Sequence, residues 1–379
     1  MTAVCQAVIR QSHGAALPTG ARVCEDAPMG KGSKKKNEKK DGKSPRQAKG
    51  GSRLRGAELS DGGAPGPGEV SSDRELTGKA AEKAARKRRK AAIAREDDAV
   101  QTDSWTQALR VGPGFSLADL DPRATPGFAG DKAAGEEVMA ELQARLGDLQ
   151  ERLYAESKGG GRRSVLLVIQ GMDTSGKGGI MRHVVGAVDP QGVQITSFKA
   201  PTDEERRHPF LWRIRRALPR PGMIGVFDRS HYEDVLIVRV HDLVPRTTWS
   251  RRYSQINAFE RGVVDEGTVI VKVMMHISSA EQKARLGERL EREDKYWKFN
   301  PDDIDERGHW ADYMQAYQSV LERCSPAAAP WFVVPADRKW YARLAVTNLL
   351  LEHLEAMDPQ WPAADFDVEA EKERLALTP

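Results

Sequence analysis

Apolar and polar residues follow a regular pattern from about residue 104 to the end of the chain. Short apolar runs alternate there with segments whose apolar residues recur every three or four positions, as in helices with one buried face. Strands that alternate with helices indicate a parallel sheet covered on both faces, so we expect one α/β domain over residues 104–379. The predicted strands are 164–170, 194–200, 223–229, 268–277 and 331–335, and the predicted helices are 136–157, 178–187, 203–218, 247–265, 280–293, 303–323 and 339–357.

Residues 1–103 lack this pattern and are rich in Lys, Gly, Ser, Pro and Ala. They hold 22 Lys and Arg against 14 Asp and Glu, so the net charge of +4 conceals a basic segment followed by an acidic remainder. So little apolar surface cannot offset the entropy of the chain, and we predict a disordered basic tail. Two functions stay open for it: an arm for an anionic partner such as RNA, DNA or polyphosphate, and a solubilising tail. Met29 is an alternative start of translation.

The composition argues against membrane-spanning and secreted classes of protein. No apolar run approaches the roughly 18 residues that a membrane span needs. The N-terminus has no continuous apolar stretch with a small-residue cleavage site. The cysteines Cys5, Cys24 and Cys324 are odd in number and widely spaced, which suggests neither disulfides nor a metal cluster. We therefore expect a cytoplasmic protein with no membrane partner.

The clearest motif is a phosphate-binding loop of sequence GMDTSGKG at residues 171–178. It has the Gly-x-x-x-x-Gly-Lys spacing, follows a buried strand and precedes a helix, which is the context that such a loop requires. Its backbone N–H groups would hold phosphate oxygens, and Lys177 would add a positive charge. The alternative is a glycine-rich turn with a chance lysine. The predicted phosphate-binding residues of the loop are Gly171, Thr174, Ser175, Gly176 and Gly178.

Two residues depart from the usual form of this loop. Gly178 stands where Ser or Thr normally helps to hold Mg²⁺, and Asp173 places a carboxylate inside a loop that attracts anions. An unpaired carboxylate 4 Å from a phosphate charge would cost about 4 kcal/mol at an effective dielectric of 20. A metal ion between Asp173 and the phosphates would turn this repulsion into attraction. Alternatively, Asp173 positions an acceptor phosphate or accepts a proton, or it is a solvent-facing acid.

The third predicted strand ends in the sequence Asp228-Arg229. An acid at the carboxyl end of a strand beside the phosphate loop is where a Walker-B-type residue belongs, and Arg229 is placed to neutralise a transferring phosphate. Glu233 follows five residues after Asp228, and we predict that it contacts the substrate. His231, Tyr232 and Asp234 are predicted to support the site or to begin a helix.

Basic side chains are concentrated near these motifs. Residues 151–300 contain 26 Lys and Arg against 19 Asp and Glu, whereas the rest of the domain is acidic. Each basic run on its own is equally explained as a solvated helix face paired with nearby glutamates. Together with a phosphate loop, the cluster indicates a substrate with several negative charges. Its members near the predicted helix 280–293 are Arg285, Arg289, Lys295 and Lys298.

Six motifs in order give the chain a family resemblance. They are GMDTSGKGG (171–179), ITSFKAPT (195–202), FDRSHYEDV (227–235), INAFER (256–261), YWKFNP (296–301) and PADRKWY (335–341). Together they resemble the family-2 polyphosphate kinases over about residues 115–368. The resemblance implies a P-loop kinase fold similar to thymidylate kinase, with a helical lid at about 280–312. It also implies Mg²⁺-dependent phosphoryl transfer between inorganic polyphosphate and a nucleoside mono- or diphosphate.

The resemblance also implies roles for single residues. Asp173, Lys177, Asp228 and Arg229 match the family's catalytic residues, with Asp173 and Asp228 as the predicted ligands of Mg²⁺. The four basic residues of the lid would bind phosphate. Glu233 would contact the nucleotide, and its presence resembles the branch that accepts AMP as well as ADP. A homo-oligomer is expected.

Two departures and two rival functions remain. The chain has Pro209 where relatives usually carry an acid and Glu293 where their lid usually has proline, which puts the lid geometry in question. One rival is an ATP-dependent nucleotide kinase of the thymidylate kinase type, which shares the loop and the Asp-Arg strand end. The other is a nucleic-acid-binding protein that acts through its basic tail.

Overall fold

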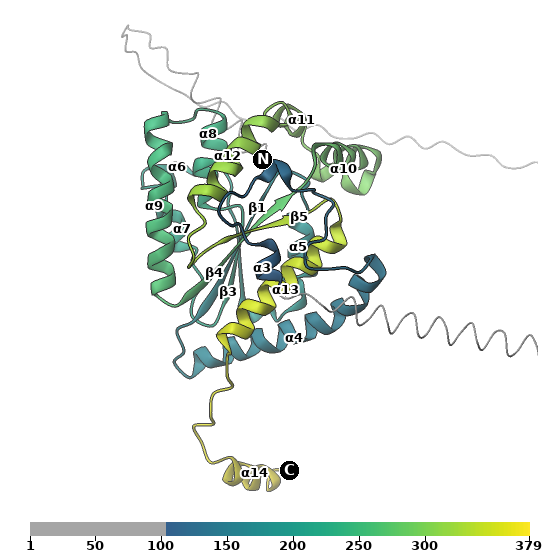
Figure 1. The fold of residues 1–379 in the computed structure, drawn as a ribbon. Coiled ribbons are helices and arrows are strands. Elements are labelled where there is room, and N and C mark those ends of the chain that lie inside the picture. The colour runs from purple at the N-terminus through teal and green to yellow at the C-terminus, as the bar shows by residue number, and fades with distance from the viewer. Residues whose placement is uncertain (1–103) are drawn as a thin grey trace, which may run out of the picture. The chain divides into compact units, whose positions relative to one another are not determined.

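The computed structural model describes residues 104–379. The predictions of a disordered tail, an anion-binding arm and an alternative start at Met29 lie outside the described residues. Element labels follow Figure 1.

Five parallel strands form one sheet, as the sequence pattern predicts. Their order is β2-β3-β1-β4-β5, so the strand that leads into the phosphate loop lies in the centre. Ile169 of β1 pairs with Asp228 of β3, which confirms that the Asp-Arg strand end lies beside the loop. The strands are β1 (Ser164–Gly171), β2 (Val193–Ser197), β3 (Ile224–Asp228), β4 (Thr268–His276) and β5 (Trp331–Pro335).

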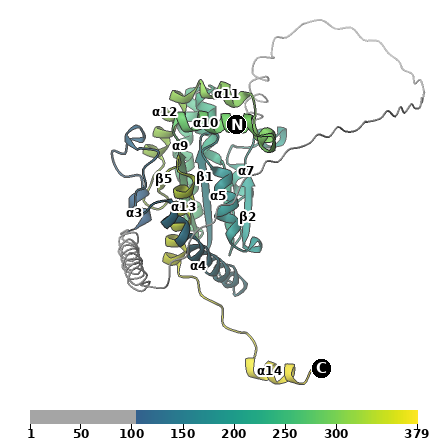
Figure 2. The same cartoon turned by 90° about the vertical axis from the view of Figure 1, so that its right-hand side faces the viewer.

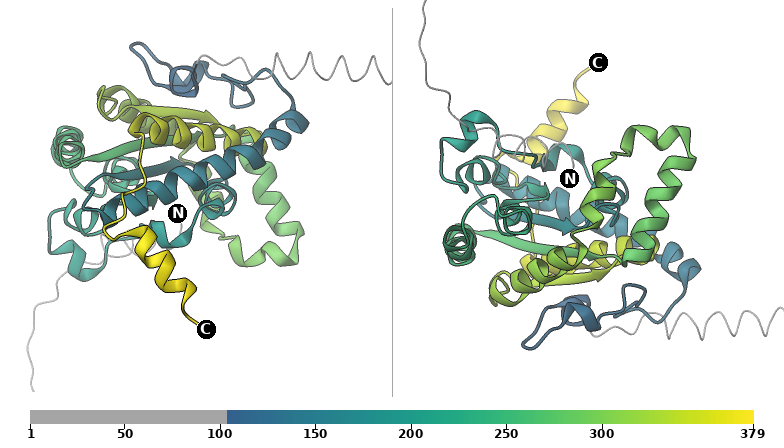
Figure 3. Two further views of the ribbon diagram at one scale, coloured as in Figure 1. Left: turned by 90° about the horizontal axis from the view of Figure 1, so that it is seen from below. Right: turned by 90° about the horizontal axis from the view of Figure 1, so that it is seen from above.

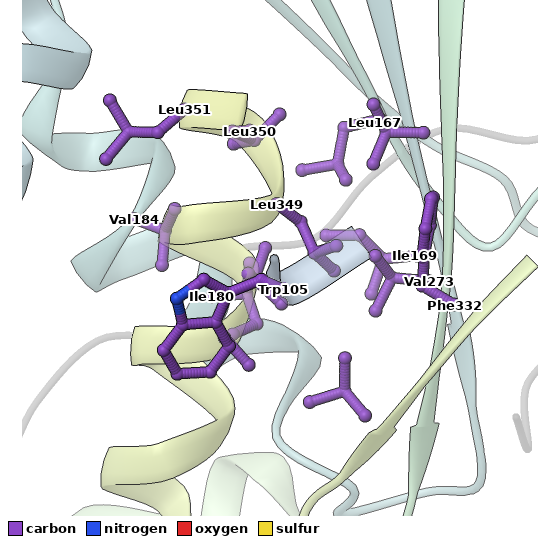
Figure 4. Close-up of a cluster of buried hydrophobic side chains, with 14 of the residues drawn as sticks. Trp105, Leu167, Ile169, Ile180, Val184, Val273, Phe332, Leu349, Leu350 and Leu351 are labelled. Carbon is purple, nitrogen blue, oxygen red and sulfur yellow. The ribbon is translucent and has the colours of Figure 1, made fainter. Parts of the chain in front are cut away.

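Helices cover both faces of the sheet, and the central strand explains why. Every residue of β1 is buried, and successive side chains point to opposite faces. Leu167 and Ile169 pack with Ile180, Val184 and the leucines of α13 on one face (Figure 4). That face is covered by α3 (Trp105–Leu109), α4 (Lys132–Lys158), α5 (Lys177–His183) and α13 (Lys339–Met357) (Figure 2).

The opposite face buries Leu166 and Val168 of the same strand. Tyr253 and Phe259 pack against this face from α9 (Arg246–Asp265), the long helix at the left of Figure 1. A short 3-10 helix directly after β3, η4, packs against that long helix. This layer contains α7 (Trp212–Arg216), η4 (His231–Val235), α8 (Ile237–Val240), α9 (Arg246–Asp265) and α12 (Trp310–Arg323).

The segment predicted as a lid lies beyond the carboxyl ends of the strands (Figure 1). It contains α10 (Ser279–Glu291), η5 (Glu293–Lys298) and α11 (Asp302–Arg307), which leads into α12 (Figure 3). The Gln282 side chain of α10 donates to the Asp173 carbonyl at 3.2 Å, and Arg307 donates to the Gln282 amide oxygen at 2.6 Å. These bonds connect both helices of the segment to the phosphate loop.

Three predicted helices are divided in the structure. The helix expected at 178–187 is α5 followed by the 3-10 helix η2 (Val185–Ala187). The helix expected at 203–218 is α6 (Asp203–Arg206) and α7, because Pro209 has no N–H and disfavours a helical conformation at His208. The helix expected at 303–323 is interrupted at Gly308 between α11 and α12. Short elements that the pattern did not predict are α3, η1 (Leu117–Asp119), η3 (Pro190–Gly192), η4, α8 and α14 (Val368–Ala376).

Within residues 104–379, no helix combines the length and the apolar character needed to cross a membrane.

Candidate active site

The phosphate loop leaves β1 through a backbone conformation that glycine favours. Gly171 has φ 153°, and a Cβ there would lie 2.7 Å from Ser175 Oγ and 2.8 Å from the Met275 carbonyl oxygen. Gly176, at the start of α5, has φ 113°. Both lie in the positive-φ region that side chains rarely adopt. The loop can therefore turn tightly enough to direct its backbone N–H groups inward.

Gly171→Ala is expected to destabilise the fold by about 1–3 kcal/mol, since it adds a contact with backbone and a strained φ. Urea unfolding followed by circular dichroism measures the change. Gly178→Ala is the matched control, because a Cβ at Gly178 meets nothing within 4 Å. Equal stability of the two variants would contradict this account of Gly171.

Lys177 bends back over the loop that precedes it. Its Nζ donates to the carbonyl oxygens of Gly171 at 2.7 Å and Met172 at 3.2 Å. Burial lowers the pKa of Lys177, and the carboxylates of Asp173 and Asp228 oppose that shift. A lysine that donates to two carbonyl oxygens can exchange them for phosphate oxygens with little movement of its ammonium group.

Asp173 and Arg229 join the loop to the end of β3. Arg229 Nη2 donates to Asp173 Oδ1 at 3.2 Å. Burial opposes the charge of Arg229, but the carboxylates of Glu233, Asp173 and Asp228 outweigh it and hold its pKa above the usual value. Arg229 also has φ 62°, a left-handed backbone that is strained for a residue with a side chain. Two oppositely charged side chains thus meet where the strand ends converge.

Glu233 lies inside this charged cluster. Burial raises the pKa of its carboxyl group, while Arg229 and Lys177 oppose the shift. With its amide turned to satisfy both neighbours, Gln170 donates to Glu233 Oε1 at 3.0 Å and accepts from Ser230 N at 3.1 Å. The predicted nucleotide residue is therefore packed among the predicted catalytic residues.

Several buried oxygen atoms around the loop have no hydrogen-bond partner among residues 104–379. They are Asp228 Oδ1, Glu233 Oε2, Thr174 Oγ1 and Ser175 Oγ. Buried acceptors are nearly always satisfied, so these oxygens are available to water, to an ion or to a ligand. Carboxylate oxygens are the donors that Mg²⁺ takes in proteins, together with water and phosphate oxygens. The residues present therefore fit a magnesium ion beside Asp228 and Asp173.

The basic residues of α10 and η5 differ in how they are held. Arg285 is buried and donates to the carbonyl oxygens of Thr174 at 2.8 Å, Ala336 at 2.8 Å and Asp337 at 2.9 Å. Its guanidinium thus braces the phosphate loop. Arg289, which is less buried, donates to the Lys298 carbonyl at 2.9 Å.

Lys295 and Lys298 lie on η5 with partners of their own. Lys295 pairs with Asp294 at 2.9 Å, and Lys298 Nζ lies 4.8 Å from the centre of the Trp297 ring. Both partners are at least half exposed to solvent, and such contacts contribute little and exchange readily. Of the four basic residues predicted to bind phosphate on this segment, these two have the contacts that exchange most readily.

A cavity of about 390 Å³ brings most of these residues together. The structure adds three cations that sequence reasoning missed, namely Arg182, Lys339 and Arg343. Lys339 and Arg343 are four residues apart on α13 and therefore lie on one helix face. This spacing is visible in the sequence and could have identified both as candidates. The cavity is lined by Asp173, Thr174, Ser175, Gly176, Lys177, Gly178, Gly179, Ile180, Arg182, Asp228, Met275, Arg285, Glu288, Arg289, Lys295, Lys298, Lys339, Ala342 and Arg343. Gly171, Arg229 and Glu233 lie outside that lining, although Arg229 reaches it through its hydrogen bond to Asp173.

The electrostatics of the cavity favour an anion. Burial and the charge of Arg182 lower the pKa of Arg343, against an opposing effect of Glu136. Burial and the charges of Arg343 and Arg182 likewise lower the pKa of His183. Cations that repel one another in this way stabilise a polyanion bound between them.

Comparison with known proteins agrees with this geometry. The family model described as polyphosphate kinase 2 (PPK2) matches residues 129–362. The chain belongs to this family. It is 45% identical over 248 residues to an AMP/ADP-polyphosphate phosphotransferase from Meiothermus ruber, covering 65% of this chain and 91% of that protein. An ADP-polyphosphate phosphotransferase from Rhodopseudomonas palustris is 41% identical over 271 residues, or 68% and 92% of the two chains.

A solved structure supports the PPK2 fold directly. The crystal structure of polyphosphate kinase 2 from Arthrobacter aurescens TC1 matches with a TM-score of 0.72 and 54% identity. The match covers 74% of this chain and 99% of that one. The predicted fold class, an α/β P-loop kinase fold with a five-stranded parallel sheet, is confirmed. The roles of the single residues stay predictions.

Proposed function

We propose that this PPK2 protein transfers the terminal phosphoryl group between inorganic polyphosphate and AMP or ADP. The observation that carries the proposal is the cavity in which cations from α5, α10, η5 and α13 surround a phosphate loop. A linear polyanion is the ligand that so many cations along one cavity would suit. The names of the Meiothermus and Rhodopseudomonas relatives supply the same substrates.

The chemistry follows from position and charge neutralisation. Backbone N–H groups at Gly176, Lys177 and Gly178 would bind the oxygens of the phosphoryl group being transferred. Lys177 and Arg229 would face the charge that spreads over these oxygens in the transition state. Because both cations are already held by carbonyls and carboxylates, little reorganisation is needed when the charge develops.

Magnesium is part of the proposal. Asp173 and Asp228 would hold Mg²⁺, and the unsatisfied Asp228 Oδ1 is the atom that supports this assignment. When bound, the ion would supply positive charge that offsets the negative charge of the substrate phosphates. Asp173 also accepts a 3.2 Å hydrogen bond from Arg229, so its carboxylate would bind both the guanidinium group and the magnesium ion.

Glu233 is proposed to govern how the nucleotide is accepted. Its buried carboxylate lies beside Arg229, where the phosphate of the nucleotide would approach the transferring group. The Meiothermus relative, named for both AMP and ADP, supports use of both nucleotides. We further propose one kinase domain over residues 104–379, with a lid at about 280–312 that closes over the substrates. A homo-oligomer and a cytoplasmic location remain predictions.

A nucleotide panel tests the function. AMP, ADP, GMP and GDP are each incubated with polyphosphate and Mg²⁺, and the reverse reaction is followed from ATP. ADP plus polyphosphate is expected to give ATP with no nucleoside triphosphate present at the start. Transfer only from ATP to a nucleotide would instead favour a kinase of the thymidylate kinase type.

Neutralising Arg182 or Arg343 is expected to weaken polyphosphate binding without altering the chemistry. Arg182→Gln and Arg343→Gln should each raise the KM for polyphosphate about threefold to fivefold. Each should also reduce the slope of log KM against log salt by about 1, because one fewer counterion is released. The KM for ADP should stay unchanged. Initial rates at several salt concentrations measure all three quantities.

The control for these variants is Arg145→Gln. Arg145 is an exposed residue of α4 that pairs with Glu355 and does not line the cavity. A salt slope that is the same in all four proteins would exclude Arg182 and Arg343 from the path of the polyphosphate.

A further inference from the structure

A buried ion pair lies beneath the active site, in the layer between the sheet and α9. Lys272 of β4 and Glu260 of α9 are both essentially inaccessible to solvent, and Lys272 Nζ lies 2.6 Å from Glu260 Oε2. Nζ also donates to the Cys324 carbonyl at 2.8 Å and to the Tyr232 hydroxyl at 3.0 Å. All three ammonium donors therefore have acceptors. None of these residues lines the cavity described above.

The second carboxylate oxygen of Glu260 extends the network to the active-site turn. Glu260 Oε1 accepts from the Tyr232 hydroxyl at 2.7 Å and lies 3.1 Å from His231 Nε2. His231 and Tyr232 are consecutive residues of η4 and are themselves buried. One carboxylate thus fixes both side chains of the dipeptide between Ser230 and Glu233.

Stability alone does not account for charges at this place. The pair is surrounded by Trp331 and Phe259, whose rings contact Tyr232 and His231. Removing two charges from water is costly, and well-packed apolar side chains of similar volume often stabilise a core equally well or better. A buried, fully hydrogen-bonded pair can instead hold its neighbours in a single arrangement.

The turn that is held in this way carries the residues with proposed roles in catalysis. Arg229 precedes the His231-Tyr232 pair with its strained φ of 62°, and Glu233 follows it. A strained residue keeps its conformation only where the surrounding structure over-determines it. The network around Glu260 supplies that constraint from one side, and Gln170 supplies it through Ser230 and Glu233 from the other.

We propose that the Glu260–Lys272 pair is a positioning device that holds Arg229 and Glu233 in their working arrangement. This inference rests on the proposed phosphotransferase function. Polyphosphate binding depends on α5, α10, η5 and α13, none of which contributes a side chain to this network. Loss of the pair therefore affects turnover and leaves the polyphosphate subsite in place.

The test removes both charges together, because a single substitution would leave a buried charge without its partner. In Glu260→Gln/Lys272→Met, kcat is expected to fall about tenfold or more through misplacement of Arg229 and Glu233. The KM for polyphosphate should stay within about threefold of the wild-type value. Circular dichroism gives the folded fraction, to which every rate is normalised.

Glu156→Gln/Arg163→Met is the matched control. This pair joins the end of α4 to the residue before β1, at the opposite end of that strand, and its loss should leave normalised kcat unchanged. Tyr232→Phe is the second variant, which keeps both charges and removes only the hydroxyl that joins them. Its kcat is expected to fall at least about threefold with an unchanged KM for polyphosphate.

The outcomes distinguish failure of the proposed function from failure of the positioning role. Absence of polyphosphate-dependent transfer in the wild-type protein would overturn the proposed function before any variant is compared. With an active wild-type protein, a wild-type normalised kcat in the folded double variant would overturn the positioning role. If the double variant does not fold, Tyr232→Phe decides, and wild-type kcat in that variant would overturn the role equally.

Discussion

Lys177→Ala is expected to lower kcat by at least about 100-fold, which corresponds to about 2.7 kcal/mol of transition-state stabilisation. The lysine is partly buried and held by two carbonyls, so its ammonium group needs little rearrangement to reach the transferring phosphate. Its charge matters most where the phosphate oxygens are most negative, in the transition state. Initial rates of ATP formation from ADP and polyphosphate measure the effect.

Lys177→Arg is a useful companion, because it keeps the charge and changes the geometry. It should recover little activity, since a planar guanidinium does not fit the space of a compact ammonium group. The urea midpoints of both variants should remain close to that of the wild-type protein. Near-normal turnover in Lys177→Ala would remove this residue from the proposed chemistry.

Asp173→Asn is expected to lower kcat by at least about 100-fold as well, for a different reason. The substitution removes one proposed ligand of Mg²⁺ and the charged acceptor of Arg229. The Mg²⁺ concentration that gives the half-maximal rate should therefore rise in Asp173→Asn. No such rise is expected in Lys177→Ala. Rates measured over a Mg²⁺ titration give both quantities at once.

Asp189→Asn is the control for this second prediction. Asp189 lies before η3, away from the cavity, and accepts from Gln191 N at 2.8 Å. Its variant should show the wild-type response to Mg²⁺. An Asp173→Asn enzyme with reduced kcat but an unchanged Mg²⁺ response would assign Asp173 to the positioning of Arg229 and not to the metal.

The parts of this fold that depend on local pattern could be predicted from the sequence. The apolar runs located all five strands, and α13 agrees with the predicted helix 339–357 at both ends. The loop at residues 171–178 and Asp228 were placed together because the carboxyl ends of neighbouring parallel strands meet. Pro209 is the sequence signal for the divided helix, because its missing N–H outweighs the helical spacing around it.

The features that depend on contacts distant in sequence could not be predicted in this way. Arg285 resembles a solvent-facing helix residue until the chain folds, when carbonyls from two other loops converge on it. Lys272 lies in an apolar strand pattern, and only the fold brings Glu260 to it. The spacing of residues along a chain shows which of them share one face of a helix or strand. It does not show which other helix or strand packs against that face.

The bracing by Arg285 has a consequence for movement over the active site. Because this residue ties α10 to both the phosphate loop and the turn after β5, the first helix of the proposed lid is fixed to the lining of the cavity. Movement of the proposed lid would then be greatest in the more exposed η5, where Trp297 is 79% exposed. Within the proposed lid, α10 would thus remain part of the phosphate site while the stretch beyond it moves over the substrates.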